Sequence, residues 1–229
     1  AGKISGFCNQ ILSGKYFPPL VQGFLSRDRT TGFSEQTVEA AVYTTFILPL
    51  FQHSRMTPEE NAVATVAGLM ALAARTAPKG KGIDTLEIVV LAKKDMKKLA
   101  ARLEKLGTDR DIGFFLRDAK NLAASDGCVI IGCRGREAAG INCSGCWYAT
   151  CADFKKAGRK KAKTGAPFEG PNCVLRMADL GIAVGSAVKT AQLHNADNRI
   201  MYSGGVAARD MGLFSRECTV AYAIPLSAT

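Results

Sequence analysis

The sequence predicts an α/β (α+β) fold in which helices surround a central sheet. Short β-branched runs at residues 86–92, 128–131 and 219–224 alternate with longer segments of helical periodicity, and this alternation is typical of the class. Hydrophobic residues make up 47% of the chain and charged residues 22%, as in ordinary globular proteins. The 229 residues are enough to bury one sizeable core and to carry an appendage.

A boundary near Met56 divides the chain. Residues 1–55 show no clean period, and we interpret them as an N-terminal extension of unknown role. Thr57 then suits a helix N-cap, Pro58 the first helical position and Glu60 the third, which together make a capping box. We therefore predict that an α/β domain spans residues 56–229 and opens with a helix.

The other elements follow from periodicity and from breakers. An amphipathic helix should begin at Lys93 and stop at Gly107, and a long apolar helix should carry Gly181 and Gly185 on one face, which permits close helix approach. The predicted order after the first helix is strand 86–92, helix 93–105, strand 128–131, helix 174–193, helix 199–211 and strand 219–224.

The pattern of cysteines carries the chemistry. Four of them lie among loop and cap residues with spacings of two, four and a longer loop, and four thiolates are the ligand set of an iron–sulfur cluster. Structural zinc sites usually pair two short Cys-x2-4-Cys units, and only the first pair here fits that rule, so a cluster is favoured while zinc stays open. The four candidates are Cys143, Cys146, Cys151 and Cys173. The remaining four are predicted to be small core hydrophobes: Cys8, Cys128, Cys133 and Cys218.

The net charge of +10 is partly concentrated in residues 155–163, which contain no acidic residue and lie between the third and fourth candidate ligands. A positive collar of this kind would speed association with an acidic redox partner protein. No aromatic residues are interleaved with the basic ones, so nucleic acid is not an expected partner.

Cellular location follows from what the sequence contains. The grouping of the cysteines favours a reducing compartment. No apolar stretch reaches the ~18–20 residues of a membrane span, and the start does not read as a signal peptide. We expect a cytoplasmic protein with no membrane partner.

Several motifs together resemble an uncharacterised prokaryotic family of ferredoxin-domain-containing proteins, from about Met56 to the C-terminus. They are Ala73-Ala-Arg-Thr-Ala-Pro-Lys79, Gly140-Ile-Asn-Cys143, Gly170-Pro-Asn-Cys173, Asp179-Leu-Gly-Ile-Ala-Val-Gly-Ser-Ala-Val-Lys-Thr190, His194-Asn-Ala-Asp-Asn-Arg199 and Ile224-Pro-Leu-Ser-Ala228. Segment 140–173 is also similar to a four-iron, four-sulfur module with a Cys-x2-Cys-x4-Cys motif and a later Cys. The resemblance implies a [4Fe–4S] centre, inserted as a loop, on Cys143, Cys146, Cys151 and Cys173.

The family pattern usually reads Asn-Cys-Gly-x-Cys-Gly, but Ser144 and Trp147 occupy the two glycine positions here. Trp147 would either shield the cluster from water or crowd the turn. The order of the elements is also similar to that of the flavin-dependent nitroreductases. That resemblance implies a homodimer and a flavin mononucleotide (FMN) site near Ala77-Pro78-Lys79, whereas a plain helix-to-strand loop is the alternative.

Three hypotheses for function result. The leading one is a [4Fe–4S] electron-transfer protein served by a redox partner. The second is a flavin-dependent oxidoreductase with an accessory cluster, and the third is a zinc-stabilised binding module. The sequence identifies no catalytic residue and no substrate.

Overall fold

The computed structural model describes residues 57–158 and 167–228. The predicted N-terminal extension and Cys8 lie outside these residues. The elements are α5 (Pro58–Thr76), the 3-10 turn η2 (Gly80–Gly82), β1 (Leu86–Ala92), α6 (Lys93–Asp109), α7 (Gly113–Ala124), β2 (Gly127–Cys133), α8 (Cys151–Lys156), α9 (Val174–Leu193), β3 (Asp197–Asn198), α10 (Tyr202–Asp210) and β4 (Val220–Ser227). None of the described helices combines the length and the apolarity needed to cross a bilayer.

A four-stranded antiparallel sheet lies at the centre, in the order β1-β2-β4-β3. Every residue of β2 is buried, because this strand is covered on both faces. Its side chains alternate between two cores as strand geometry requires. Val129 and Ile131 join one core, whereas Cys128 and Ile130 join the other.

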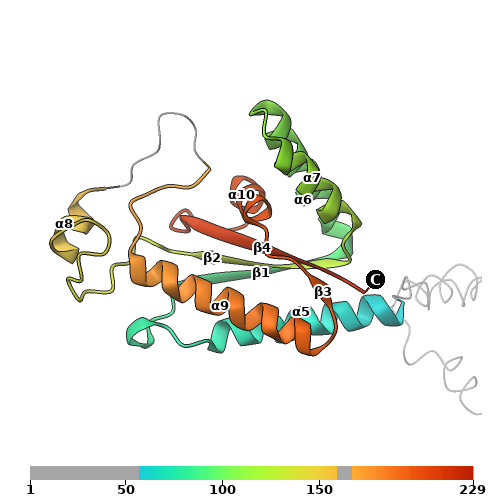
Figure 1. Cartoon of the computed structure of the whole chain (residues 1–229), viewed down its shortest axis with the longest axis horizontal. Coiled ribbons are helices and arrows are strands. Elements are labelled where there is room, and N and C mark those ends of the chain that lie inside the picture. The colour runs from blue at the N-terminus through green and yellow to red at the C-terminus, as the bar shows by residue number, and fades with distance from the viewer. Residues whose placement is uncertain (1–56, 159–166, 229) are drawn as a thin grey trace, which may run out of the picture. The chain divides into compact units, whose positions relative to one another are not determined.

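Helices cover both faces of the sheet in three layers. Figure 1 shows α5 and α9 side by side along one face, with α6, α7 and α10 on the other. Buried residues of α5 and α9 line the first core, and those of α6, α7 and α10 line the second. The predicted α/β class, with helices around a central sheet, is confirmed.

The capping box at the start of α5 is present as predicted. The Glu60 backbone N–H donates to Thr57 Oγ1 and the Thr57 N–H donates to the Glu60 carboxylate, each at 3.2 Å. Because both donors would otherwise lack a partner at the helix end, this local motif fixes where the domain's first helix begins.

Glycines account for the main differences from the predicted elements. Gly107 does not stop α6, which continues to Asp109, because a Cβ there would lie 2.9 Å from Phe115 Cβ of α7 and the bare backbone lets the two helices pack. Gly181 and Gly185 have nothing within 4 Å of an added Cβ, so the predicted close approach on α9 is wrong. The close approach belongs to Gly205 of α10, where a Cβ would lie 1.9 Å from the Ala221 carbonyl oxygen of β4.

Candidate functional site

The four candidate ligands lie at one end of the sheet, in a small lobe that we call the cysteine lobe (residues 138–158 with Cys173). The lobe contains α8 and ends at the start of α9 (Figure 1). It has a core of its own, separate from the two that flank the sheet. Phe154 and Cys173 are buried there, and Cys146, Tyr148 and Leu175 pack against them.

Each candidate cysteine has a different degree of exposure. Cys173 is buried at the N-cap of α9, and its backbone N–H donates to the Gly135 carbonyl at 2.8 Å. Cys146 and Cys151 are half-buried, whereas Cys143 is exposed. One side of the lobe therefore holds a protected sulfur, and the other side opens to solvent.

The loop on the exposed side of the lobe packs against Val174, which follows Cys173 and is the first residue of α9. A Cβ on Gly145 would lie 2.6 Å from Val174 Cγ1 and 3.8 Å from Cys143 Sγ. Only glycine fits at this contact without displacing Val174. The loop that carries Cys143 and Cys146 is thus packed directly against the start of α9, where the fourth cysteine stands.

The loop before α8 turns through an unusual run of left-handed residues. Gly140, Asn142, Ser144 and Trp147 have φ of 75°, 49°, 58° and 74°. Left-handed residues in a loop can turn backbone N–H groups toward an anion, and concave sites of this kind bind phosphates and iron–sulfur centres. Ser144 and Trp147 stand where the family pattern has glycine, and the left-handed backbone is the physical reason for glycine there.

The backbone of this loop lowers the pKa of the Cys151 thiol. A hydrogen bond from the Asn142 backbone is the largest influence and lowers the pKa of Cys151, with further lowering from the backbones of Gly140 and Ile141 and from the charge of Lys155, against an opposing effect of burial. The Asn142 side chain also accepts the Cys151 N–H at 2.8 Å. The loop therefore favours a thiolate at Cys151, the form that binds metal.

The cysteines predicted to belong to the core behave differently. Cys128, Cys133 and Cys218 are buried, which confirms the prediction for these three. Burial raises the pKa of Cys128 and of Cys218 to about 12 and that of Cys133 to about 11. These thiols stay protonated, so they are poor ligands and weak nucleophiles.

The donor atoms of the lobe do not converge on a single point. Among the described residues, no three His, Cys, Asp or Glu side chains are arranged to hold one metal ion. A tetrahedral zinc site needs sulfurs about 3.8 Å apart, since each Zn–S bond is about 2.3 Å. In an iron–sulfur cluster each thiolate binds a different iron, so the sulfurs stand farther apart than they do around a single zinc ion.

Arg136 fastens α8 to the rest of the lobe. Its guanidinium donates to the carbonyls of Gly158 (2.8 Å), Lys155 (3.3 Å) and Phe154 (3.5 Å), and it lies 5.2 Å from the centre of the Phe154 ring. These carbonyls lie in the last turn of α8 and just beyond it, where carbonyls have few helical partners. The Arg134-Gly-Arg136 segment therefore serves as a turn and a helix cap.

We expect Arg136→Ala to loosen the lobe without unfolding the domain. Amide hydrogen exchange in residues 151–158 should rise roughly tenfold, because several hydrogen bonds to a charged group are lost together. Arg134→Ala is the matched control, since Arg134 bonds the carbonyl of Asp84 and the carboxylate of Glu137 instead of α8. Equal exchange in the two variants would contradict the assignment.

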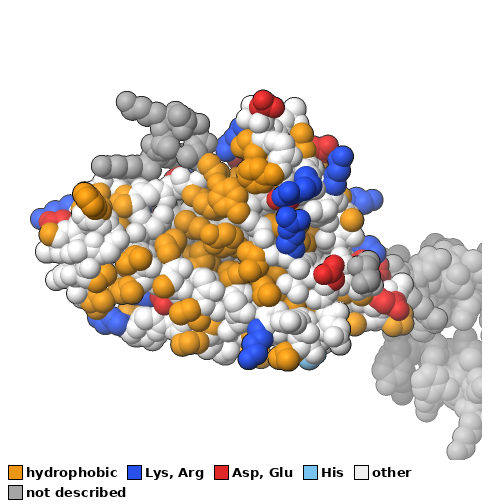
Figure 2. Space-filling model, in the orientation of Figure 1, with side chains coloured by type: hydrophobic (Ala, Val, Ile, Leu, Met, Phe, Trp, Pro, Cys, Tyr) orange, Lys and Arg blue, Asp and Glu red, His pale blue; other side chains and the backbone are white. Residues whose placement is uncertain are grey.

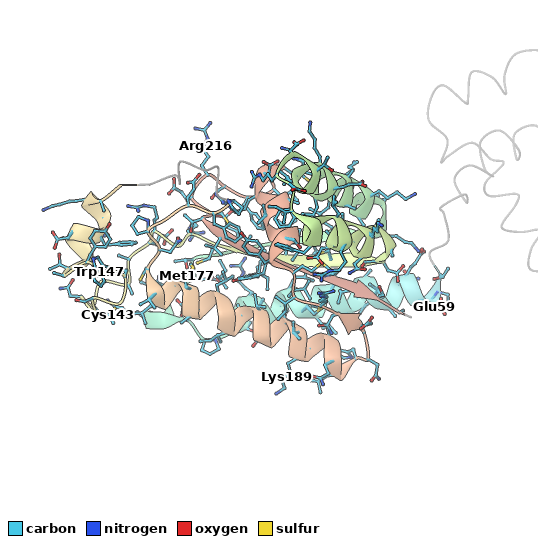
Figure 3. All side chains as sticks on the ribbon, turned by 45° about the horizontal axis from the view of Figure 1, so that its top comes forward. Glu59, Cys143, Trp147, Met177, Lys189 and Arg216 are labelled. Carbon is cyan, nitrogen blue, oxygen red and sulfur yellow. The ribbon has the colours of Figure 1, made fainter. Side chains whose placement is uncertain are left out.

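Trp147 does not shield the lobe. Its side chain is 95% exposed, which does not support the first of the two alternatives for this residue, that it shields the cluster from water. Figure 3 shows Trp147 and Cys143 at the same end of the molecule, remote from Glu59 and Lys189.

The segment that the nitroreductase resemblance proposes for flavin forms a helix-to-strand loop. The Lys79 ammonium donates to the carbonyls of Ala74 (2.9 Å), Ala77 (2.8 Å) and Arg75 at the end of α5. Its side chain is 6% exposed. Lys79 thus caps a helix, as the alternative interpretation expects.

Sequence reasoning missed a buried ion pair beneath the lobe. Arg176 and Asp179 of α9 lie 2.9 Å apart, with side chains 1% and 5% exposed. Arg176 Nε donates to the Glu137 carbonyl at 3.0 Å, and the Asp179 carboxylate accepts the Gly80 N–H at 2.8 Å. The only signal was two charges in an apolar helix, which the sequence alone marks as evidence against a membrane span.

Fold and site together describe an α/β protein with a four-cysteine lobe. The chain belongs to the family of uncharacterised proteins containing a ferredoxin domain (DUF2148), whose model matches residues 169–229. An uncharacterised protein of Archaeoglobus fulgidus is 44% identical over 172 residues, which cover 74% of this chain and 89% of that protein. The predicted family is therefore confirmed.

Solved structures of nitroreductases align with part of the chain. An FMN-dependent nitroreductase of Clostridium difficile R20291 matches with a TM-score of 0.43 and 14% identity, covering 71% of this chain and 74% of that one. A nitroreductase of Lactococcus lactis, solved in complex with nicotinic acid, matches with a TM-score of 0.44 and 12% identity over 76% and 80% of the two chains.

Proposed function

We propose that this chain is a redox protein that transfers electrons through a [4Fe–4S] cluster held by Cys143, Cys146, Cys151 and Cys173. The observation that carries the proposal is that all four cysteines lie in one lobe, which has a small core of its own and a loop of left-handed residues. The ferredoxin domain in the family's description supports the same chemistry.

The residues of the lobe fit such a group by their chemistry. Four thiols are present, and the loop stabilises negative charge at one of them. N–H groups of the loop and the nearby Lys155 favour the more negative reduced state and so raise the potential. When bound, the cluster supplies one-electron transfer. The buried position of Cys173 excludes water on one side, while the exposure of Cys143 leaves the other side open to a partner.

Analysis of the purified protein tests the proposal. We expect about four irons and four sulfides per chain after anaerobic purification or reconstitution. A broad visible band should bleach with dithionite. Protein reconstituted in full anaerobiosis that contains neither iron nor sulfide would contradict the proposal.

The same preparation separates the two other hypotheses. Released FMN together with iron would identify the flavin-dependent oxidoreductase, whereas stoichiometric zinc without visible absorption would identify the zinc-stabilised module. The mass of the protein in solution tests the homodimer that the nitroreductase resemblance implies.

A further inference from the structure

We propose that the exposed side of the cysteine lobe, centred on Trp147, is the docking surface for an acidic electron-carrier protein. This inference rests on the proposed redox function and identifies the partner that the exchange of electrons requires. We call the surface the docking face, formed by Ile141, Trp147 and Val174 with the lysines around them.

The Trp147 side chain is barely packed against the described part of the chain. Its ring is 95% exposed, and its φ of 74° places a bulky residue in a region that glycine prefers. An exposed tryptophan held in a left-handed turn is unfavourable for the free protein on both counts. Tryptophan is among the residues most enriched at the energetic centres of protein interfaces.

Two further apolar side chains lie beside the exposed cysteine. Ile141 is 51% exposed and Val174 is 43% exposed. Val174 adjoins Gly145, next to the Cys143 sulfur, and the backbone of Ile141 lies at the Cys151 thiol. The apolar residues of the docking face thus lie on the same lobe as the cysteines through which electrons would leave.

Basic side chains lie on the same lobe as these apolar residues, although Lys155 also shares a hollow with Glu137 and Glu217. Lys155 and Lys156 are exposed on α8, and Lys81 Nζ lies 3.9 Å from the position of a Cβ on Gly140. Within residues 138–158 the single acidic residue is Asp153, whose carboxylate accepts the Thr150 hydroxyl at 2.6 Å. Figure 2 shows hydrophobic and basic side chains, with an acidic one among them, at the end of the molecule that carries α8.

An apolar centre with a basic border fits a partner of the opposite pattern. Such a partner would present carboxylates around an apolar patch over its own cofactor. Charge complementarity speeds encounter, and a small apolar contact then allows rapid release, as electron-transfer complexes require. A single aromatic residue gives no platform for successive bases, so the face does not suit nucleic acid.

Binding can be measured without the cluster, because Trp147 is the chain's one tryptophan. The full-length protein is titrated with a purified, tryptophan-free, acidic plant-type ferredoxin at low salt. We expect acrylamide quenching of the tryptophan emission to fall at least about twofold on binding and to recover at ~1 M ionic strength, where the Debye length is about 3 Å. Unchanged quenching in a cluster-loaded protein would overturn the docking face and leave the redox function standing.

Electron transfer provides the second readout. In the dithionite-reduced, cluster-loaded protein, Trp147→Gly should slow electron transfer to the ferredoxin about tenfold and leave transfer to methyl viologen unchanged. Glycine relieves the left-handed backbone, so loss of folding does not explain the result. Leu193→Ala is the matched control: Leu193 is 71% exposed at the far end of α9, about 30 Å along the helix from Val174.

Three other results would also test the docking face. Equal slowing with methyl viologen would mean that Trp147 acts on the cluster, and a changed sedimentation coefficient in Trp147→Gly would mean that a second copy covers the face. Either result overturns the proposal. A protein without iron or sulfide that still protects Trp147 from acrylamide would refute the redox function and retain the docking face.

Discussion

Replacement of Cys151 by alanine is expected to remove the cluster almost completely. The iron and sulfide bound after reconstitution should fall by more than the 10–100-fold that loss of an outer partner of a metal ligand typically causes. The reason is that Cys151 is a proposed ligand whose pKa is lowered by the backbone of the neighbouring loop, so its loss would remove both a thiolate and the negative charge that the loop favours. Iron analysis and the visible spectrum of the reconstituted variant measure this directly.

A buried cysteine provides the matched control. Cys218→Ala also removes one sulfur, but burial holds the pKa of that thiol at about 12, so it does not act as a ligand. We expect full iron content in this variant and near-complete loss in Cys173→Ala. Normal iron content in Cys151→Ala, or loss in Cys218→Ala, would show that the ligand set is assigned wrongly.

The sequence predicts those parts of the fold that depend on neighbouring residues. The capping box at Thr57 and Glu60 and the strand at residues 128–131 follow from spacings of two to four residues. The antiparallel order of the sheet does not follow, because strand pairing joins residues far apart in the chain, such as Ile131 of β2 and Tyr222 of β4.

The glycines of α9 and α10 show the same limit of sequence-based prediction at the level of single residues. Gly181 and Gly185 have the spacing of a close helix contact, yet they face solvent. Gly205 has no distinctive spacing, yet its Cα lies against the Ala221 carbonyl. Spacing along a helix identifies a bare face, but only the tertiary structure decides which bare face receives a neighbour.

For the candidate site, the sequence predicts the cysteines and misses their surroundings. The four candidate ligands are recognisable because their residue type and spacing are local. The exposure of Trp147 depends on the tertiary structure, and the role of Arg136 depends on carbonyls as far along the chain as Gly158. Interactions of this kind leave no periodic trace in the sequence.

Replacement of Arg176 by methionine is the second large effect that we expect, with a loss of about 3–5 kcal/mol in the free energy of unfolding. The substitution leaves the Asp179 carboxylate buried with its charge uncompensated, and it removes donors to the carbonyls of Gly80, Ile83 and Glu137. Urea denaturation with a fixed slope measures the change. Replacing Arg75 provides a control, because Arg75 forms a half-exposed ion pair with Asp84 and should cost about 1 kcal/mol or less.

The double variant Arg176→Met with Asp179→Leu distinguishes the effect of an uncompensated buried charge on stability from the effect of losing the hydrogen bond that positions the lobe. Because two apolar residues of similar volume leave no buried charge, we expect it to recover much of the stability lost in Arg176→Met. The lobe should nevertheless remain loosened, since Arg176 Nε holds the Glu137 carbonyl just before the left-handed loop, and methionine cannot. Recovered stability with lowered iron retention would show that the buried pair positions the cysteine lobe. Recovery of both would show that its role is confined to the stability of the domain.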